Sequence, residues 1–403
     1  MKICLVTPGY QPEVGGGIGT YASNLATALV SAGHSVHVIA KTSGLQEKTD
    51  TIDGVRVHRL RHRHLPGLEP HMPGLRWSAS VSRKIEEIDR SDGIDIIEFP
   101  NWEGPGLWYL LKRRRRPAIV KVHTPYFETL KLDKPSTLPN MGDRFVCWQE
   151  KQSCLLADGI TSSTEHHRQY MARSYDIDPR RIEVIPLGIR GPMGGDAPCH
   201  RSYDDTACRI LYLSRLESRK GTLALIDAIP LVLERHPRTE FVFVGEDRPH
   251  APGDRKFSEY LRERFPACLA NVRFVGYVPD SEVPSYYRNA DLFVVPSNYE
   301  SFGLVFVEAM FYGLPVVGGR AGGIPEVIDD NRNGLLVELN SCHDVASKII
   351  RLIEDPALRR LFGTNGLLAA QGRFHAETMA RKTEAFYRKI IERASKDQTG
   401  GGA

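Results

Sequence analysis

Short apolar runs alternate with longer amphipathic segments along this chain, and the alternation restarts after a polar interruption near its middle. This pattern is typical of βαβ units, in which a helix connects two parallel strands. With 403 residues, the chain is long enough for two such domains, each with a core of its own. We therefore expect an α/β protein of two Rossmann-like domains, with ligands at the carboxyl ends of the strands.

The first half contains seven of the apolar runs that we interpret as strands, at 2–6, 35–40, 55–60, 94–98, 118–122, 159–162 and 182–185. The predicted helices between them lie at 19–32, 75–89, 104–115, 142–157 and 164–174. A polar stretch rich in glycine and proline follows at 191–198, and its composition is that of a linker.

In the second half, strands are expected at 209–214, 240–245, 272–276, 291–296, 315–318 and 334–338. The helices include one at 303–312 and a long amphipathic one at 375–393. We predict an N-terminal domain at 1–188 and a C-terminal domain at 189–374. The remaining residues, 375–403, are expected to form a helix that packs back on the N-terminal domain, followed by a disordered tail.

Composition excludes several classes of protein. The net charge is only +4, from 53 basic and 49 acidic residues, which is too weak a bias for a nucleic-acid-binding protein. The seven cysteines are scattered, without the paired spacing of a zinc site, and indicate reduced thiols in the cytoplasm. No apolar run is long enough to serve as a signal sequence or to span a membrane.

The most informative segment, residues 296–310, joins a predicted strand to a helix and carries two carboxylates, Glu300 and Glu308. Eight helical residues rise by about 12 Å, so the two carboxylates can reach different ends of one extended ligand. The start of a helix lies between them, and its N–H groups suit a diphosphate. Carboxylates are natural bidentate acceptors for vicinal sugar hydroxyls. The alternative is that both glutamates only decorate helix ends.

Two basic residues occupy another strand-to-helix turn in the second half. Arg215 and Lys220 flank the turn after the strand at 209–214, where their charges can stabilise a departing diphosphate. Taken alone, two such cations are usually solvated. The glycine-rich segment 318–323 lets the backbone approach a ligand closely, although a glycine-rich turn alone is a weak signal.

Together these motifs resemble the paired-glutamate signature of glycosyltransferase family 4. Ser-Phe-Gly after Glu300 and Ala-Met after Glu308 fit that pattern, and so do the segments 313–317, 322–326 and 333–337. The spacing of Arg215 and Lys220 resembles the same family's diphosphate clamp. The glycine loop 15–17 and the segment 185–188 extend the resemblance over nearly the whole chain.

The resemblance implies the GT-B architecture, in which two Rossmann-like domains face each other across a cleft. It also implies a retaining transferase that uses a nucleotide diphosphate sugar as co-substrate and needs neither a metal nor another cofactor. By carry-over, Glu308 would hold the ribose hydroxyls and Glu300 the transferred sugar. Arg215 and Lys220 would bind the diphosphate. The backbone amides expected to help them are those at Phe302, Gly303 and Leu304.

On the first-domain side, the resemblance implies that Gly16 and Gly17 close over the donor and that His123 lies beside the reacting sugar. Residues 17–22 also match a GxGxxA dinucleotide fingerprint. That fingerprint requires glycines directly after the strand and an acidic residue at the end of the second strand. Neither condition holds, because the second strand ends at Lys41 and Thr42. An oxidoreductase is therefore disfavoured.

Acceptor binding is expected at the ends of the strands at 94–98 and 118–122, through Glu98, Trp102 and Tyr126. The segment 124–140 is expected to be a mobile acceptor loop. A basic run, Lys112 to Arg116, is predicted to end an apolar helix; contact with anionic lipid and simple surface decoration both remain open. Arg59 and its basic neighbours are interpreted as a solvated strand edge.

The leading hypothesis is therefore transfer of a hexose from a UDP- or GDP-sugar, UDP being favoured, to a hydroxyl acceptor. The first alternative is a phosphorylase or a sugar-nucleotide hydrolase that uses the same cleft. A catalytically silent sugar-nucleotide-binding protein is the second, but it predicts damaged motifs, whereas Arg215, Lys220, Glu300 and Glu308 are all present.

Overall fold

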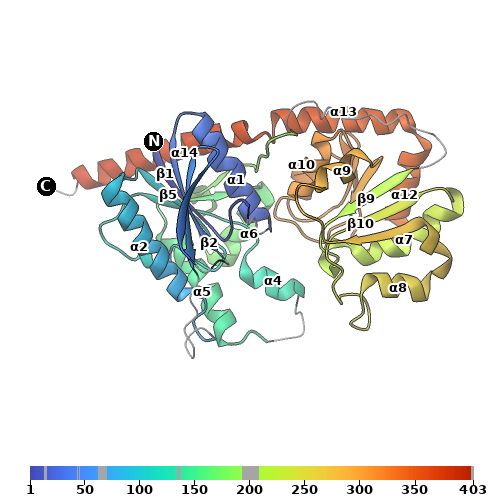
Figure 1. Ribbon diagram of the computed structural model, residues 1–403, viewed down its shortest axis with the longest axis horizontal. Helices are drawn as coiled ribbons and strands as arrows, with labels where there is room; N and C mark the ends of the chain where they lie inside the picture. Colours follow the sequence, from blue (N-terminus) through green and yellow to red (C-terminus); the bar gives the residue numbers. More distant parts are fainter. Residues whose placement is uncertain are drawn as a thin grey trace. The chain divides into compact units, whose positions relative to one another are not determined.

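The computed structural model describes residues 1–400 apart from 13–15, 43, 45, 62–69, 134–137 and 193–207. It divides into two compact units (Figure 1). Unit 1 comprises Met1–Ile189 and Ala376–Ala403, and unit 2 comprises Arg190–His375. The two boundaries follow Ile189 and His375, each one residue beyond the predicted position. Residues 401–403, the end of the predicted tail, lie outside the described residues.

Unit 1 is built on a sheet with the strand order β3-β4-β2-β1-β5-β6-β7-β8. All neighbours are parallel except β3 and β4, which pair antiparallel. Leu5 of β1 lies opposite Val38 of β2 and Glu98 of β5, so β1 is at the centre. The strands are β1 (Lys2–Thr7), β2 (Ser35–Thr42), β3 (Lys48–Ile52), β4 (Val55–Arg61), β5 (Ile96–Pro100), β6 (Ala118–Lys121), β7 (Gly159–Ser162) and β8 (Ile182–Val184).

Helices cover both faces of this sheet, as its buried strands require. On one face, α1 packs against the strands and against α14, which runs along unit 1 in red (Figure 1). Residues from α2, α3, α5 and α6 form the core of the other face. The helices are α1 (Gly16–Ser31), α2 (Leu75–Ser91), α3 (Leu107–Leu110), α4 (Tyr126–Asp133), α5 (Met141–Leu156), α6 (Glu165–Tyr175) and α14 (Ala376–Gly400), with a 3-10 turn η1 (Pro179–Arg181).

Unit 2 has a wholly parallel sheet with the order β11-β10-β9-β12-β13-β14. This is the doubly wound order, in which the direction of the connections reverses between the two central strands, here β9 and β12. The strands are β9 (Arg209–Leu213), β10 (Glu240–Val244), β11 (Val272–Gly276), β12 (Leu292–Val295), β13 (Val316–Gly319) and β14 (Gly334–Val337).

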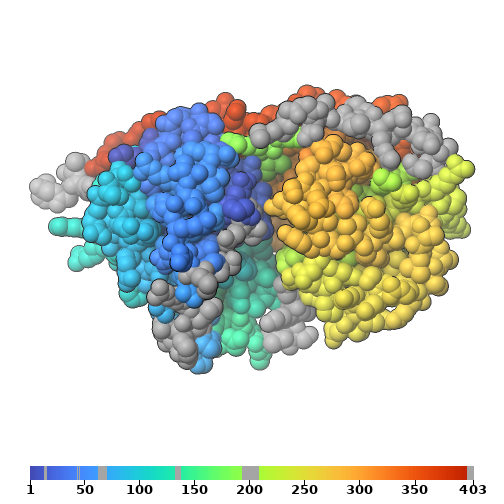
Figure 2. All heavy atoms as spheres, in the orientation of Figure 1, coloured from blue at the N-terminus to red at the C-terminus, as the bar shows by residue number. Residues whose placement is uncertain are grey.

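The helices of unit 2 pack mainly in pairs, α7 with α12 and α10 with α13. The segment from α8 to α10 forms the yellow and orange surface in the space-filling view (Figure 2). The helices are α7 (Thr222–Arg235), α8 (Phe257–Arg264), α9 (Val283–Arg288), α10 (Leu304–Phe311), α11 (Ile324–Val327), α12 (Cys342–Glu354) and α13 (Pro356–Gly372), with 3-10 turns η2 (Ser218–Lys220) and η3 (Pro266–Asn271).

The structure differs from the sequence-based prediction in three places of unit 1. Strand β3 was not predicted, because its residues are polar and mostly exposed at the sheet edge. The predicted helix at 104–115 is only the single turn α3, which lies between Gly106 and the basic run. The predicted acceptor loop contains α4, and its residues 134–137 lie outside the described part of the chain.

Arg59 also departs from the prediction, because it is not solvated. Its side chain is fully buried, and its guanidinium Nη1 donates a hydrogen bond of 3.0 Å to the carbonyl oxygen of Tyr10. Nη2 donates to the carbonyl of Gln11, and Nε lies 3.4 Å from the carboxylate of Asp50 on β3. The arginine thus satisfies backbone acceptors between β1 and the glycine loop.

Candidate functional site

The candidate donor site lies in unit 2, at the carboxyl ends of β9 and β12. These strands are neighbours at the point where the sheet's connections reverse, which is where open α/β sheets bind their ligands. The turn after β9 carries Arg215 and Lys220 and leads into α7. The loop after β12 carries Glu300 and leads into α10, on which Glu308 lies.

Glycines allow these loops to approach one another. Gly221 has φ +69°, and a Cβ there would lie 1.9 Å from the carbonyl oxygen of Pro296. Gly322 has φ +56°, and a Cβ there would lie 2.2 Å from the carbonyl oxygen of Glu300. The next residue, Gly323, donates its N–H to that same oxygen at 2.8 Å. The glycines of the 318–323 segment therefore hold the backbone of Glu300 in place.

Lys220 and Glu300 form an ion pair at the centre of the site. Their side chains are only 12% and 13% exposed, and Ser297 Oγ donates to the same carboxylate oxygen at 3.3 Å. Burial alone raises the pKa of Glu300, but the charges of Lys220 and Arg219 outweigh it, so this pKa lies below its usual value. Burial lowers the pKa of Lys220, against the attraction of Glu300. Glu300, which is predicted to contact the sugar, is therefore adjacent to Lys220, which is predicted to bind the diphosphate.

Arg215 lies at the same turn but is half exposed. Its guanidinium Nη1 is 2.9 Å from Glu217 Oε1, while Arg219 Nε is 2.9 Å from Glu217 Oε2. Glu217 is buried, so its carboxylate is a fixed support for both arginines. Sequence reasoning missed Glu217, because nothing in the motif shows that its side chain turns inward.

Helix α10 begins at Leu304, after Gly303 in the left-handed conformation at φ +95°. Its N-cap residue, Gly303, offers no side chain as a cap, so in the described part of the chain the N–H groups of Leu304 and Val305 are available to an anion. Phe302 is buried, and its ring packs edge-on against Phe374. The side chain of Phe302 is therefore packed in the core, and its backbone amide is the group that it can offer to a sugar nucleotide. Glu308 is the fifth residue of the helix, about one turn from its start, so the eight residues from Glu300 to Glu308 are not all helical as assumed in the prediction.

Glu308 has one specific partner within the described residues. Its Oε2 accepts a hydrogen bond of 2.8 Å from the hydroxyl of Tyr287 on α9. Burial raises the pKa of Glu308, the nearby charge of Asp280 adds to the rise, and the hydrogen bond from Tyr287 opposes it. Tyr287 was not predicted, because its contact with Glu308 spans 21 positions and follows no local pattern.

In unit 1, the predicted residues follow the carboxyl ends of β1, β5 and β6, except Glu98, which lies within β5. Gly16 and Gly17 form the start of α1, and a Cβ at either position would meet nothing within 4 Å. Among the described residues, none therefore crowds these two positions. Residues 13–15, which include the first glycine of the loop, lie outside the described residues.

His123 follows β6 and is 7% exposed. Its backbone N–H donates to Asn101 Oδ1 at 2.7 Å, and the edge of the Tyr21 ring lies against its imidazole, 5.4 Å between centroids. In the described part of the chain, its Nε2 is buried without a hydrogen-bond partner. Burial and the charge of Lys121 hold the pKa of His123 well below its usual value, so the ring is neutral.

Glu98 does not fit the predicted contact with an acceptor. It is 4% exposed, and its two carboxylate oxygens accept hydrogen bonds from Tyr21 at 2.7 Å and Tyr387 at 2.8 Å. The ammonium of Lys121, which donates to the carbonyl of Ile185, is the nearby cation. This carboxylate joins the returning helix α14 to the sheet, which explains why a charged residue is tolerated at the centre of β5.

Trp102 and Tyr126 do lie together. Their rings meet edge-on, with centroids 5.6 Å apart, and Tyr126 donates its hydroxyl to Asp143 at 2.8 Å. Behind them, the buried carboxylate of Glu150 on α5 accepts the backbone N–H groups of Glu103 at 3.1 Å and Tyr126 at 3.0 Å. Burial raises the pKa of Glu150 to about 8. Sequence reasoning missed Glu150, which fixes the segments that carry the two aromatic rings.

Most cations of the basic run form ion pairs with acidic residues of unit 1. Lys112 pairs with Glu86, Arg115 with Asp158 at 2.5 Å, and Arg116 with Asp89 at 3.0 Å. These three cations lie beyond the end of α3 and not in its last turn, so the prediction that they end a helix was wrong. The ion pairs favour surface decoration over lipid contact.

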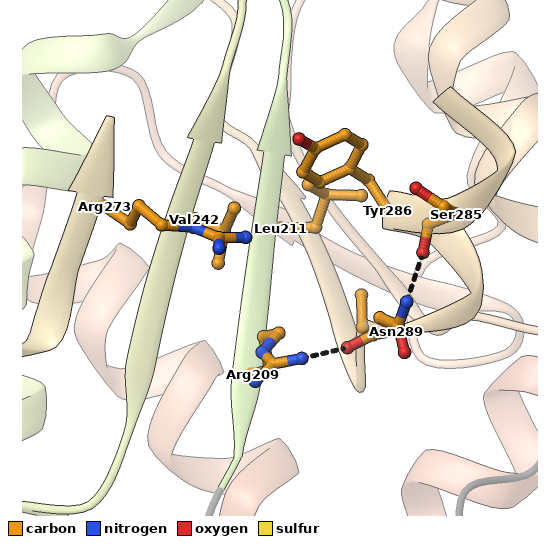
Figure 3. A pocket seen from close by; sticks show the side chains of 8 residues that line it. Arg209, Leu211, Val242, Arg273, Ser285, Tyr286 and Asn289 are labelled. Carbon is orange, nitrogen blue, oxygen red and sulfur yellow. Dashed lines mark hydrogen bonds between the residues drawn. The ribbon is translucent and has the colours of Figure 1, made fainter. Parts of the chain in front are cut away.

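A pocket of about 320 Å³ in unit 2 does not coincide with the donor site (Figure 3). Leu211 and Val242 form its floor, and Arg209 and Arg273 flank it. Arg209 is the first residue of β9, so the pocket lies toward the opposite end of the strands from Arg215. Arg209 already pairs with Glu240 at 2.8 Å.

Two kinds of feature are absent from the described residues. No cluster of three or more histidine, cysteine or acidic side chains is placed to hold a metal ion in this part of the chain. Among the helices that the structure describes, none combines the length and the apolar character that crossing a bilayer requires.

Comparison with known families gives two matches that together cover most of the chain. Residues 202–368 match the family described as Glycosyl transferases group 1. Residues 15–190 match the family described as Glycosyltransferase Family 4. The first match includes all the predicted donor residues of unit 2, and the second includes Gly16, Gly17 and His123.

Individual relatives are similar to this chain over nearly its full length. The D-inositol 3-phosphate glycosyltransferase of Corynebacterium jeikeium (strain K411) is 30% identical over 390 residues, covering 90% of this chain and 91% of that protein. Sucrose-phosphate synthase from Thermosynechococcus elongatus has a TM-score of 0.75 at 23% identity, covering 97% of this chain and 99% of that one. Anabaena HepE in complex with UDP-glucose has a TM-score of 0.67 at 21% identity, covering 98% and 100%. These two structures share the fold of this chain.

Proposed function

Because the chain belongs to glycosyltransferase family 4 and has the GT-B fold of such enzymes, we propose that this transferase moves a hexose from a nucleotide diphosphate sugar to a hydroxyl acceptor. The observation that carries the proposal is the adjacent placement of Lys220, Glu300 and the uncapped start of α10. Cation, carboxylate and helix end are the three groups that a sugar diphosphate needs, and unit 2 supplies them at the reversal point of its sheet.

Each donor group then has a role that follows from its chemistry. The charges of Arg215 and Lys220, together with the N–H groups at the start of α10, bind the diphosphate. Glu300 accepts hydrogen bonds from the hydroxyls of the transferred sugar, and Glu308 accepts them from the ribose. We favour UDP over GDP as the donor nucleotide, because Anabaena HepE, with the same fold, binds UDP-glucose.

The proposed reaction retains the anomeric configuration and uses no protein nucleophile. The acceptor oxygen forms a bond to the anomeric carbon on the face from which the diphosphate departs. The bond between that carbon and the phosphate oxygen breaks, and the oxygen keeps the electron pair. This oxygen also takes the proton of the acceptor hydroxyl. Arg215 and Lys220 stabilise the negative charge that develops on it, so no metal ion is required.

His123 is proposed to contact the sugar through its unpartnered Nε2. A neutral imidazole either donates or accepts at this atom, depending on its tautomer. Trp102 and Tyr126 are proposed to line the acceptor site, with Glu150 supporting them from behind. The six cysteines among the described residues are free thiols, which supports a cytoplasmic location.

The proposal is tested by measuring thermal stabilisation with a panel of UDP-, GDP- and ADP-sugars, followed by mass spectrometry of the products. The acceptor panel includes inositol phosphates, because the relative from C. jeikeium is named for that acceptor. We expect one sugar nucleotide to stabilise the protein and a glycosylated product to form only when an acceptor is present. Release of free sugar without an acceptor would indicate a hydrolase, and binding without any product a silent binding protein.

A further inference from the structure

The buried Tyr287 and the partly buried Glu308 form a hydrogen-bonded pair in unit 2, and Tyr287 lies outside the motif predicted from the sequence. Tyr287 belongs to α9 and is 2% exposed. Its hydroxyl donates to Glu308 Oε2 at 2.8 Å. The second carboxylate oxygen, Oε1, accepts no hydrogen bond from the residues that the structure describes. One oxygen of Glu308 is therefore held, and the other remains for a ligand.

The ring of Tyr287 is itself fixed by other aromatic side chains. It stacks on Tyr312, with centroids 5.1 Å apart and planes 12° apart. It also packs against Phe293 on β12, 5.7 Å between centroids. Burial and the neighbouring Glu308 carboxylate raise the pKa of its hydroxyl well above the usual value, so the group stays protonated and donates. A rigid ring with a permanent donor sets the orientation of the carboxylate.

The orientation of the Glu308 carboxylate matters because two vicinal hydroxyls can donate to it together only when its acceptor sites point toward both of them. A glutamate side chain on a helix has three rotatable bonds, and fixing them when a ligand binds costs conformational entropy. A carboxylate that is already held by a buried donor avoids much of that cost, and this improves binding. The advantage applies only to a ligand whose two hydroxyls contact the carboxylate.

We propose that Tyr287 is a positioning residue for Glu308, and that through Glu308 it sets the preference for a nucleotide with both ribose hydroxyls. This inference depends on the proposed function, because it assumes that Glu308 receives the ribose of a nucleoside diphosphate. Tyr287 itself does not touch the nucleotide. Its contribution appears as discrimination between ribose and deoxyribose.

The pair also predicts how this discrimination depends on pH. The described groups that shift the pKa of Glu308 are Tyr287, whose hydrogen bond lowers it, and Asp280, whose charge raises it in addition to burial. Removal of the Tyr287 hydroxyl leaves burial and Asp280 in place, so the pKa of Glu308 rises further. The preference for ribose should then disappear at a higher pH in the variant than in the natural protein.

The test is Tyr287→Phe, which removes the hydroxyl and keeps the ring. Affinities of the full chain for UDP, 2′-deoxy-UDP and 3′-deoxy-UDP are measured by calorimetry between about pH 5 and 8, the range in which a raised carboxyl pKa is visible. We expect the natural protein to prefer UDP by about tenfold or more, as for a hydrogen bond to a charged group. In the variant, the preference should shrink several-fold, with the affinity for the deoxynucleotides unchanged.

Tyr260→Phe is the matched control. Tyr260 in α8 is also buried, and its hydroxyl also donates to a carboxylate, Asp227, at 3.1 Å. This variant should lose a similar hydrogen bond without any change in the preference for ribose. Thermal unfolding of both variants shows whether they fold.

A Tyr287→Phe protein that binds UDP and both deoxynucleotides more weakly by one factor would show a merely structural role and overturn the inference. An unchanged preference for ribose would overturn it as well. If the natural protein binds UDP without preferring ribose, only the inference fails, and the proposed function stands. If it binds no nucleoside diphosphate, with GDP and ADP tested in parallel, both fail together.

Discussion

The ammonium of Lys220 and the carboxylate of Glu300 form an ion pair across 80 positions of sequence, and both side chains are largely shielded from water. Each buried charge is therefore compensated before any donor arrives, as buried ions require. In the proposed complex, a diphosphate that approaches Lys220 competes with Glu300 for the same ammonium group. When it binds, the carboxylate becomes available to the sugar hydroxyls, so the two predicted roles of the pair are linked.

This linkage separates the effects of Glu300→Ala on binding and on turnover. Without the carboxylate, Lys220 is free to pair with the diphosphate, so the affinity for UDP or GDP should be equal to or higher than that of the natural protein. The sugar loses its acceptor, and kcat should fall on the order of a hundredfold, as when a preorganised polar contact is removed. Calorimetry with the nucleotide and initial-rate kinetics with the sugar nucleotide measure the two quantities.

Glu300→Gln is the control for this variant, because it keeps the size and removes the charge. It should also retain nucleotide affinity and lose turnover. The assignment of Glu300 to the sugar would be wrong if either variant kept full activity, or if the loss appeared entirely as weaker nucleotide binding.

The alternation of strands and helices could be predicted from the sequence because strands buried on both faces of a parallel sheet are continuously apolar, as all four residues of β12 are. The edge strand β3 could not be predicted, because its polar residues carry no such pattern. The same reasoning failed for Arg59, which looks solvated among its basic neighbours. Only the fold brings the carbonyls of Tyr10 and Gln11 to its guanidinium.

The candidate donor site was predictable where residues of one loop act together, as Glu300 and the start of α10 do. The residues that support the site from behind could not be predicted. Glu217 turns inward to hold two arginines, and Tyr287 reaches Glu308 from another helix. Glu98 was misinterpreted for the same reason, since its partner Tyr387 is 289 positions away. Contacts at such separations depend on packing, which local periodicity does not encode.

Nucleotide recognition through Glu308 should weaken in acid. Burial raises the pKa of this carboxyl above its usual value, and only the ionised form accepts hydrogen bonds from both ribose hydroxyls. The contribution of Glu308 to nucleotide affinity is therefore present above the raised pKa and is lost as the pH falls through it. This loss occurs at a higher pH than it would for an ordinary glutamate. The ratio of affinities for UDP and 2′-deoxy-UDP measures it, because the phosphates titrate alike in both. Glu308→Gln should make this ratio small and independent of pH.

Tyr387→Phe should destabilise unit 1 without any change in the donor site. The substitution leaves the buried Glu98 carboxylate with one hydroxyl donor in place of two. A buried acceptor that loses its partner costs about 1–3 kcal/mol of unfolding free energy. Chemical denaturation measures the loss, and Tyr277→Phe, at a tyrosine that is 78% exposed, should have almost no effect. Equal stability of the two variants would contradict the role of Tyr387 in anchoring α14.

Gly322→Ala should damage the sugar contact through the backbone. The new Cβ would lie 2.2 Å from the carbonyl oxygen of Glu300, and φ is +56°. Strain of this kind costs about 1–3 kcal/mol, and the clash adds to it. We expect kcat to fall together with the melting temperature. Gly17→Ala, where a Cβ meets nothing within 4 Å, should leave stability almost unchanged and shows whether an alanine is tolerated where space is open.

Removal of divalent metal ions should leave transfer unchanged, because the chain's own cations are proposed to compensate the departing diphosphate. Arg215 and Lys220 supply two positive charges, and the start of α10 adds the partial charge of its N–H groups. Initial rates after dialysis against EDTA should therefore match those with added Mg²⁺ or Mn²⁺. In contrast, Lys220→Ala should lower kcat by about a hundredfold or more, and added Mg²⁺ should not restore it. A rate that falls with EDTA and returns with metal would show that an ion, rather than these side chains, stabilises the leaving group.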